Sequence, residues 1–256
     1  MKISIGSIFF DSPRNSVWLD LQQRFIQETT NCDYEYAVYL NHIESDELFR
    51  SVELIGHNPN PPAARKGVSI SHSHANAISA VVDYFQTREA DYFLILDSDC
   101  FPFVLGWPQK LVSKMGLCSF AAPVRYENLD VFPHPSAFFM SNEFLGRGPD
   151  FSVTSTTNLL GDVFDDVAAG ISLKDIYPLV RTNYLNLHPV LFGIYHYFYH
   201  HGCGSRPVTM RTLAAKYYDQ YSDNQKVIEL ENRTFKRLRH NPKSIIHLLT
   251  RGKTWL

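Results

Sequence analysis

The chain has 256 residues, of which 45% are hydrophobic and 20% charged, so it can bury a substantial core within one large domain. Its formal net charge of −2 excludes a general electrostatic attraction to nucleic acid and leaves that role only to a local basic patch. The 4 cysteines are far apart and lack zinc-ligand spacing, which favours reduced thiols in a cytoplasmic protein.

The chain opens with an apolar stretch, residues 2–10, that is rich in Ile and Phe. Asp11, Pro13 and Arg14 follow it without a small-residue cleavage site, so the stretch predicts a first strand and not a signal peptide. No apolar run approaches the roughly 20 residues that cross a bilayer. We therefore expect a cytoplasmic protein that is soluble or peripherally bound at the cytoplasmic face of the membrane.

Helices and strands alternate through the next ninety or so residues. Apolar residues at helical spacing predict a helix over 17–29, and residues 34–40 predict the second strand. Residues 52–55 predict a third strand, which a cluster of prolines follows. A helix is expected from Ser71 onward, and an apolar run within residues 91–97 predicts a fully buried strand.

This alternation predicts an α/β fold whose sheet is mostly parallel and covered on both faces. Active sites of such sheets lie beyond the carboxyl ends of the strands. In the later half, residues 120–125, 134–140 and 187–199 are strand-like, and residues 162–173 predict a helix.

Two carboxylates follow the buried strand directly, in Asp97-Ser98-Asp99. Acids at positions i and i+2 can bind a hard divalent cation, and Ser98 between them is free to contact a sugar or ribose. Oxygen ligands favour Mg²⁺ or Mn²⁺. Because Asp and Ser are ordinary turn formers, a solvated junction between strand and turn is the alternative interpretation.

The residues from Gly67 to Asn76 and from Tyr92 to Asp99 resemble those of glycosyltransferase family 2 and related GT-A enzymes, and the resemblance covers most of the chain. It implies a single-domain, Rossmann-like GT-A fold with a mostly parallel central sheet flanked by helices. It also implies a nucleotide-diphosphate sugar as donor, with a UDP-sugar favoured, bound through a metal ion at Asp97 and Asp99.

On this resemblance, Ser7, Asp11 and Asn76 are expected to contact the nucleoside, together with Ser98. Asp11 stands beside Pro13, so a simple turn acid is the alternative for that residue. Many relatives carry acids after the second strand, where this chain has Asn41-His42. The identity of the nucleotide base therefore stays open.

The segment from Tyr195 to Arg206 is similar to the late His-Gly-Ser region of metal-dependent GT-A proteins, where a histidine completes the metal sphere. His201 or His200 is the expected ligand, and Arg206 is expected to pair with the diphosphate. In a continuous strand, His196 and His200 share one face and His201 faces the other way. The alternative is that these histidines cap an aromatic core strand.

Asp165 and Asp166 lie near the start of the predicted helix 162–173. Acids in a first turn ordinarily stabilise a helix through its dipole. The resemblance implies a second role, because an acid at a comparable helix start deprotonates the acceptor hydroxyl in inverting enzymes. Asp166 is the expected general base, with Asp165 next to it as the second choice. His134 to Ser136 and Tyr126 are weaker candidates for the acceptor side.

Residues 232–256 form a basic amphipathic tail that has no acidic residue. We expect a GT-A catalytic domain over 1–231, with a nucleotide-binding half (1–100) and an acceptor half (101–231), followed by this helical tail. A solvated helix packed on the domain is the favoured interpretation of the tail. The alternatives are a peripheral membrane contact and a polyanion site.

Together these features predict a metal-dependent glycosyltransferase that moves a sugar, with inversion, from a nucleotide sugar to an acceptor hydroxyl. A surface glycan, a lipid-linked sugar and, less favoured, a nucleic acid are the acceptors considered. A nucleotidyltransferase is one alternative, although residues 7–15 lack the Gly-rich phosphate loop of that class. A non-catalytic relative that binds nucleotide or sugar is the other.

Overall fold

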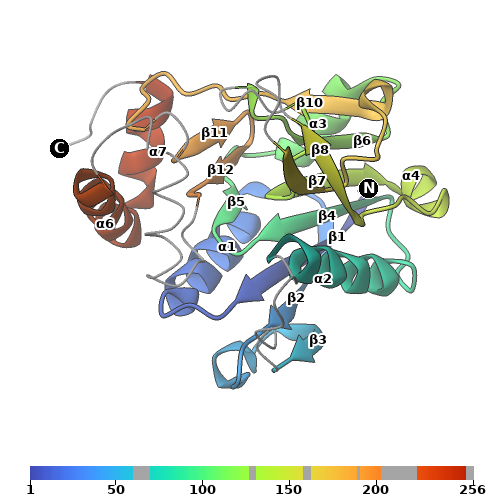
Figure 1. The fold of residues 1–256 in the computed structure, drawn as a ribbon, viewed down its shortest axis with the longest axis horizontal. Helices are drawn as coiled ribbons and strands as arrows, with labels where there is room; N and C mark the ends of the chain where they lie inside the picture. The colour runs from blue at the N-terminus through green and yellow to red at the C-terminus, as the bar shows by residue number, and fades with distance from the viewer. Residues whose placement is uncertain (60–69, 127–130, 158–162, 189–190, 203–223, 252–256) are drawn as a thin grey trace.

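The computed structural model describes residues 1–59, 70–126, 131–157, 163–188, 191–202 and 224–251. A central sheet is built from strands β1 (Lys2–Phe10), β2 (Asp33–Asn41), β3 (Glu53–Asn58), β4 (Tyr92–Asp97), β6 (Phe120–Pro123), β7 (Ala137–Ser141) and β10 (Ile176–Leu179). These 7 strands follow the order β10-β6-β7-β4-β1-β2-β3 (Figure 1).

All neighbouring strands of this sheet are parallel except at β7, which runs antiparallel to both β4 and β6. Helix α1 (Asn15–Thr29) connects β1 to β2, and α2 (Ile70–Phe85) precedes β4. The two helices pack on opposite faces of the sheet (Figure 1). The predicted fold class, α/β with a mostly parallel central sheet flanked by helices, is confirmed.

Strand β4 is apolar on both faces because each face is covered. Phe93 and Ile95 belong to the core under α2, whereas Leu94 and Leu96 belong to the core under α1 and α3 (Trp107–Met115). Close packing of α2 also explains Gly6 in β1, since a Cβ atom there would lie 2.6 Å from Val81 Cγ1. The carboxyl ends of β1, β2 and β4 consequently meet at one edge of the sheet.

A second, three-stranded sheet brings distant parts of the chain together. It consists of β5 (Cys100–Pro102), β11 (Gly193–Tyr195) and β12 (Phe198–His200), with β12 in the middle and all pairs antiparallel. A turn at residues 196–197 separates β11 from β12, and His196 has a φ of 54° there. The expectation that His196 and His200 share one face of a continuous strand is therefore wrong.

The predicted helix over residues 162–173 is also wrong. Residues Val163–Val167 form strand β9, which pairs antiparallel with β8 (Val153–Thr157) along its whole length. The spacing of the acids resembled a helix start, but strand pairing and the burial of Val167 and Ala168 in the core beneath α2 determine the local structure. A short 3₁₀ helix follows only at Leu173–Asp175.

The basic C-terminal segment forms helices α6 (Asn224–His240) and α7 (Pro242–Arg251), so residue 232 lies within α6. Leu238, Ile245 and Leu249 are buried in the core that also contains α1, β5 and β12. These helices therefore pack on the domain and lie to the left of α1 in Figure 1. Among the helices of the described segments, none is both long and apolar enough to cross a membrane.

Candidate functional site

The Asp97-Ser98-Asp99 segment connects β4 to β5 at the carboxyl edge of the sheet. Odd-numbered residues of β4 face α2, and Asp97 continues this alternation: its Oδ1 lies 3.0 Å from Nε2 of His74 on α2. Asp99 is almost fully buried. The amide of Asp97 donates to the carbonyl oxygen of Ser136 at 3.1 Å, which anchors the start of the turn.

Gln22 holds this turn from beneath. Its amide nitrogen donates to the carbonyl oxygens of Asp97 and Cys100, each at 2.7 Å, and its amide oxygen accepts a hydrogen bond from the hydroxyl of Tyr36 at 2.8 Å. Sequence reasoning missed this residue. The signal was present, because Gln22 is a polar residue on the otherwise apolar stripe of α1 that contains Trp18 and Phe25.

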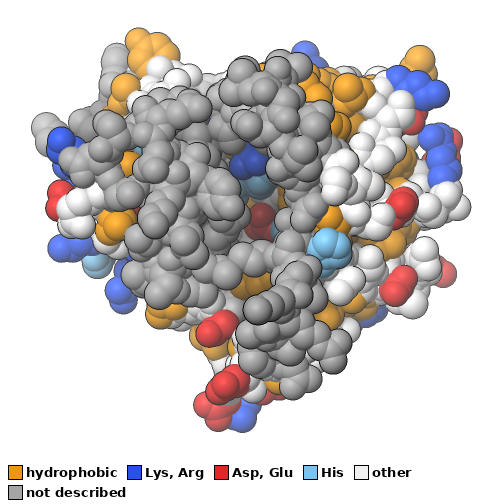
Figure 2. Space-filling model, in the orientation of Figure 1, with side chains coloured by type: hydrophobic (Ala, Val, Ile, Leu, Met, Phe, Trp, Pro, Cys, Tyr) orange, Lys and Arg blue, Asp and Glu red, His pale blue; other side chains and the backbone are white. Residues whose placement is uncertain are grey.

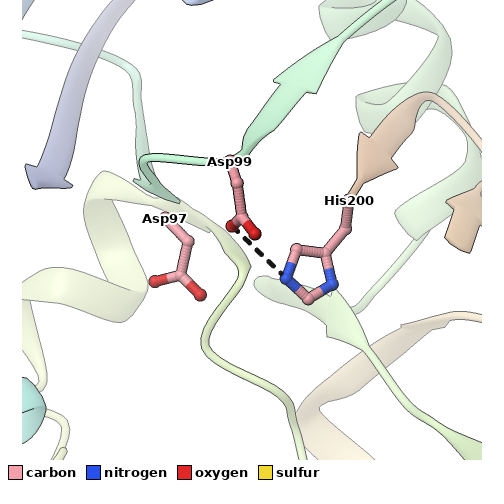
Figure 3. Close-up of side chains that lie close together, drawn as sticks. All are labelled: Asp97, Asp99 and His200. Carbon is pink, nitrogen blue, oxygen red and sulfur yellow. Dashed lines mark ion pairs between the residues drawn. The ribbon is translucent and has the colours of Figure 1, made fainter. Parts of the chain in front are cut away.

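His200 reaches the same turn from the other end of the chain. Strand β12 pairs with β5 so that His200 lies opposite Cys100, the residue after Asp99. As a result, Nε2 of His200 lies 3.6 Å from Oδ1 of Asp99. Figure 3 shows the side chain of Asp99 pointing toward His200, with the carboxylate of Asp97 beside them.

The ligand atoms of Asp97, Asp99 and His200 all lie within 4.8 Å of one another. Two ligand atoms that are each about 2.1 Å from an octahedral ion lie about 3 Å apart when adjacent and about 4 Å apart when opposite. The separation between Asp99 and His200 falls within this range. Two carboxylates and an imidazole suit Mn²⁺ better than Ca²⁺, which prefers an all-oxygen set.

His200 is in the protonation state that binds a metal. Burial lowers the pKa of its imidazole, and the charges of Arg125 and His201 act in the same direction, outweighing the opposite influence of the two aspartates. A neutral imidazole offers a lone pair to a cation without prior loss of a proton. The site thus combines negative charge with a neutral nitrogen donor.

Two serine hydroxyls beside the turn are buried and have no hydrogen-bond partner among the described residues: those of Ser98 and Ser136. Buried hydroxyls are rarely left unpaired unless a ligand or water satisfies them. Ser136 is one of the residues that the sequence suggested for the acceptor side, and the ring of neighbouring His134 lies 5.3 Å from that of His200. Figure 2 shows acidic, basic and histidine side chains at the bottom of a hollow on this face.

His201, the other predicted metal ligand, lies in a different cluster. Its ring is fully buried, with Nδ1 2.8 Å from the Tyr199 hydroxyl and Nε2 3.2 Å from Oε1 of Glu231. Glu231 also forms a buried ion pair with Arg14. Burial alone would raise the pKa of Glu231, but hydrogen bonds from His201 and Arg14 lower that pKa to about 2.

The residues expected to contact the nucleoside do not share one environment. Ser7 is buried within β1, Asp11 is exposed just after it, and Asn76 is exposed on α2. Sequence reasoning missed the polar group between these positions, at the ends of β2 and α2. There, Nδ2 of Asn41 donates to Oγ of Ser73 at 3.0 Å, and Nε2 of His42 lies 2.5 Å from the same oxygen.

Three other predictions fall elsewhere. Asp165 and Asp166 lie in β9, where their backbones are opposite Ser155 and Thr154 of β8. Because neighbouring residues of a strand alternate between its two faces, only one of the two acids can belong to a given face of the hairpin. Arg206 lies outside the described residues, and Tyr126 is 53% exposed.

No family model matches this chain, and no curated protein does. Among solved structures, it is similar to the mannosyltransferase PcManGT from Pyrobaculum calidifontis, which was solved in complex with GDP-Man and Mn²⁺. The similarity covers 58% of this chain and 47% of that one, with a TM-score of 0.41 and 11% sequence identity. The chain thus spans about half the length of that protein. Function is accordingly inferred from the residues of the site itself.

Proposed function

We propose that this chain is a metal-dependent glycosyltransferase that moves a sugar from a nucleotide-diphosphate sugar to an acceptor hydroxyl, with inversion at the anomeric carbon. The convergence of Asp97, Asp99 and His200 at the carboxyl edge of the sheet carries this proposal. The unpartnered hydroxyls of Ser98 and Ser136 add support, since they offer hydrogen bonds to a ligand at the same place.

In this proposal, Asp97, Asp99 and His200 hold the divalent ion, which when bound supplies positive charge to the diphosphate leaving group. Ser98 is proposed to contact the sugar or ribose, and Ser7, Asp11 and Asn76 are proposed to line the nucleoside side. Arg206 stays a proposed counter-charge for the diphosphate. Neither UDP nor GDP is favoured by the contacts described above, so both belong in the assay.

The proposed general base is Asp166, with Asp165 as its alternative. A carboxylate here would take the proton of the acceptor hydroxyl as the oxygen attacks the anomeric carbon, and no covalent sugar-enzyme intermediate is needed. The acceptor side is proposed to include His134 and Ser136. The acceptor itself is proposed as a glycan or a lipid-linked sugar, ahead of a nucleic acid.

The metal site is tested by calorimetry with Mn²⁺ and either UDP or GDP. Asp97→Asn and Asp99→Asn should each abolish metal-dependent nucleotide binding, because each removes a charged ligand, whereas Asp20→Asn on the exposed side of α1 should bind as the wild type does. Unchanged, metal-independent affinity in both variants would remove the proposal. Binding without sugar transfer would instead favour the non-catalytic alternative, and release of pyrophosphate from a nucleoside triphosphate would favour a nucleotidyltransferase.

The base is tested by comparing Asp166→Asn with Asp165→Asn. Loss of a general base typically lowers the rate by ~10²- to 10⁴-fold while donor binding persists. Because the two residues alternate along β9, one variant should lose transfer and the other should retain it. Near-normal transfer in both variants, or a product with retained anomeric configuration, contradicts the inverting mechanism with a base on β9.

A further inference from the structure

His201 is tied to its surroundings by three groups. The carboxylate of Glu231 can only accept, so Nε2 of His201 carries the proton and donates to it at 3.2 Å. Nδ1 is then the acceptor for the hydroxyl of Tyr199 at 2.8 Å. The ring also packs against Trp18, with 5.0 Å between ring centroids. This buried imidazole therefore has a fixed tautomer and a fixed orientation.

Glu231 is held just as firmly on its other side. Both guanidinium nitrogens of Arg14 donate to its carboxylate, and one of them also donates to the side-chain oxygen of Asn232 at 2.8 Å. The same guanidinium lies 3.9 Å above the ring of Phe235. Helix α6 is thus fastened to the residue before α1 and, through His201, to the end of β12.

The backbone of His201 connects this cluster to the candidate metal site. Its amide donates to the carbonyl oxygen of Asp99 at 3.0 Å, and its peptide bond continues directly from His200. The position of His201 therefore fixes the distance between the backbones of Asp99 and His200. Any movement of the His201 ring away from Glu231 acts on both of these candidate ligands together.

We propose that Glu231 and Tyr199 are positioning residues of the metal site, which set its affinity by holding His201 and, through it, Asp99 and His200. This inference rests on the metal site of the proposed function. It differs from a purely structural role in one respect. A structural role lowers only the stability of the fold, whereas a positioning role also lowers the affinity for Mn²⁺ in the folded protein.

The test measures Mn²⁺ binding to the full chain by electron paramagnetic resonance, alongside unfolding in urea. Loss of outer-shell partners of a metal ligand typically costs about 10- to 100-fold in affinity, and we expect a decrease of that size in Glu231→Met. Glu231→Gln keeps an oxygen acceptor for His201 and should recover part of the affinity. The surface variant Glu229→Gln, on the exposed side of α6, should not differ from the wild type.

Leu238→Ala is the matched control for stability, because Leu238 is fully buried on α6 and makes none of these hydrogen bonds. We expect it to destabilise the fold and to change Mn²⁺ affinity by less than about threefold. Equal affinities in Leu238→Ala and Glu231→Met overturn the inference. If Glu231→Met does not fold, Tyr199→Phe decides: reduced affinity supports the inference and unchanged affinity overturns it. A wild-type chain that binds no Mn²⁺ refutes the metal site itself, a distinct result.

Discussion

Two clusters that each combine carboxylate with imidazole lie next to each other around the end of β12. One contains Asp97, Asp99 and His200, and the other contains Glu231 and His201. In the second cluster, Arg14 supplies a permanent positive charge to Glu231. In the first, the contacts printed by geometry are to imidazoles: His74 on Asp97 and His200 on Asp99.

This difference separates a structural ion pair from a candidate site. A buried carboxylate paired to arginine has its charge balanced and its lone pairs occupied, so it has little capacity for a ligand. Carboxylates that face a neutral imidazole keep a strong affinity for a cation. Adjacent residues in the sequence, His200 and His201, therefore have different surroundings and different expected roles.

The largest effect is expected from breaking the arginine pair. Arg14→Met leaves the buried carboxylate of Glu231 without its permanent cation, which should lower the free energy of unfolding by about 3 to 5 kcal/mol. The matched control is Arg50→Met, which removes an exposed pair with Glu47 and should cost at most about 1 kcal/mol. Urea unfolding measures both. A loss in Arg14→Met no greater than the loss in Arg50→Met contradicts a structural role for the cluster.

A third buried histidine shows what happens to an imidazole beside arginine. Burial, together with the charge of Arg181, lowers the pKa of His188 to about 4. The unfolded chain, with its ordinary pKa of about 6.5, then binds a proton more readily than the folded chain. Stability is therefore complete above pH 6.5 and falls as the pH falls from 6.5 toward 4.

The expected loss between pH 7 and pH 5 is about 2 kcal/mol from this one residue. His188→Gln should remove that part of the pH dependence, as measured by urea unfolding at the two pH values. His247→Gln, on α7, is the control and should retain the pH dependence of the wild type. If His188→Gln keeps the full pH dependence, proton uptake by other groups is responsible, and the contrast between the histidines loses its third member.

Sequence patterns predicted the first half of the molecule because its signals are local. Strand β4 is a continuous apolar run that ends in acids, and the helices around it have clear apolar stripes. The placement of the acids at the edge of a parallel sheet followed from these features alone. The meeting of His200 with Asp99 did not follow, because it depends on pairing between β5 and β12, two strands of 3 residues each that are far apart in the sequence.

The assignment of Asp165 and Asp166 to a helix failed for a related reason. Acids and apolar residues at helical spacing are a weak local signal, and the partner that determines the structure, β8, has no strong pattern of its own. The buried side of α6 was likewise not predicted, since its basic residues dominate the sequence and Glu231 lies just before them. In each case the deciding contact joins segments that the sequence alone does not align.

The smallest effect concerns the exposed basic side of α6. Deletion from residue 232 onward would remove buried Leu238 and Leu249 and would therefore unfold part of the core, so charge substitution is the cleaner test of a membrane or polyanion contact. Arg233 and Arg237 are both exposed and lie one helical turn apart. If this side contacts anionic lipid, Arg233→Gln/Arg237→Gln should lose about 1 kcal/mol of vesicle binding per residue.

Co-sedimentation with phosphatidylserine vesicles across a range of salt concentrations measures this loss. Lys110→Gln/Lys114→Gln on α3 removes the same charge at the same spacing from another helix and is the matched control. A contact specific to α6 predicts that only the α6 variant weakens binding and that the difference vanishes at high salt, where exposed charges are screened. Equal losses in the two variants indicate a response to net charge alone. The wild type binding no vesicles leaves α6 as a helix packed on the domain, with Glu231 as its charged contact to the site.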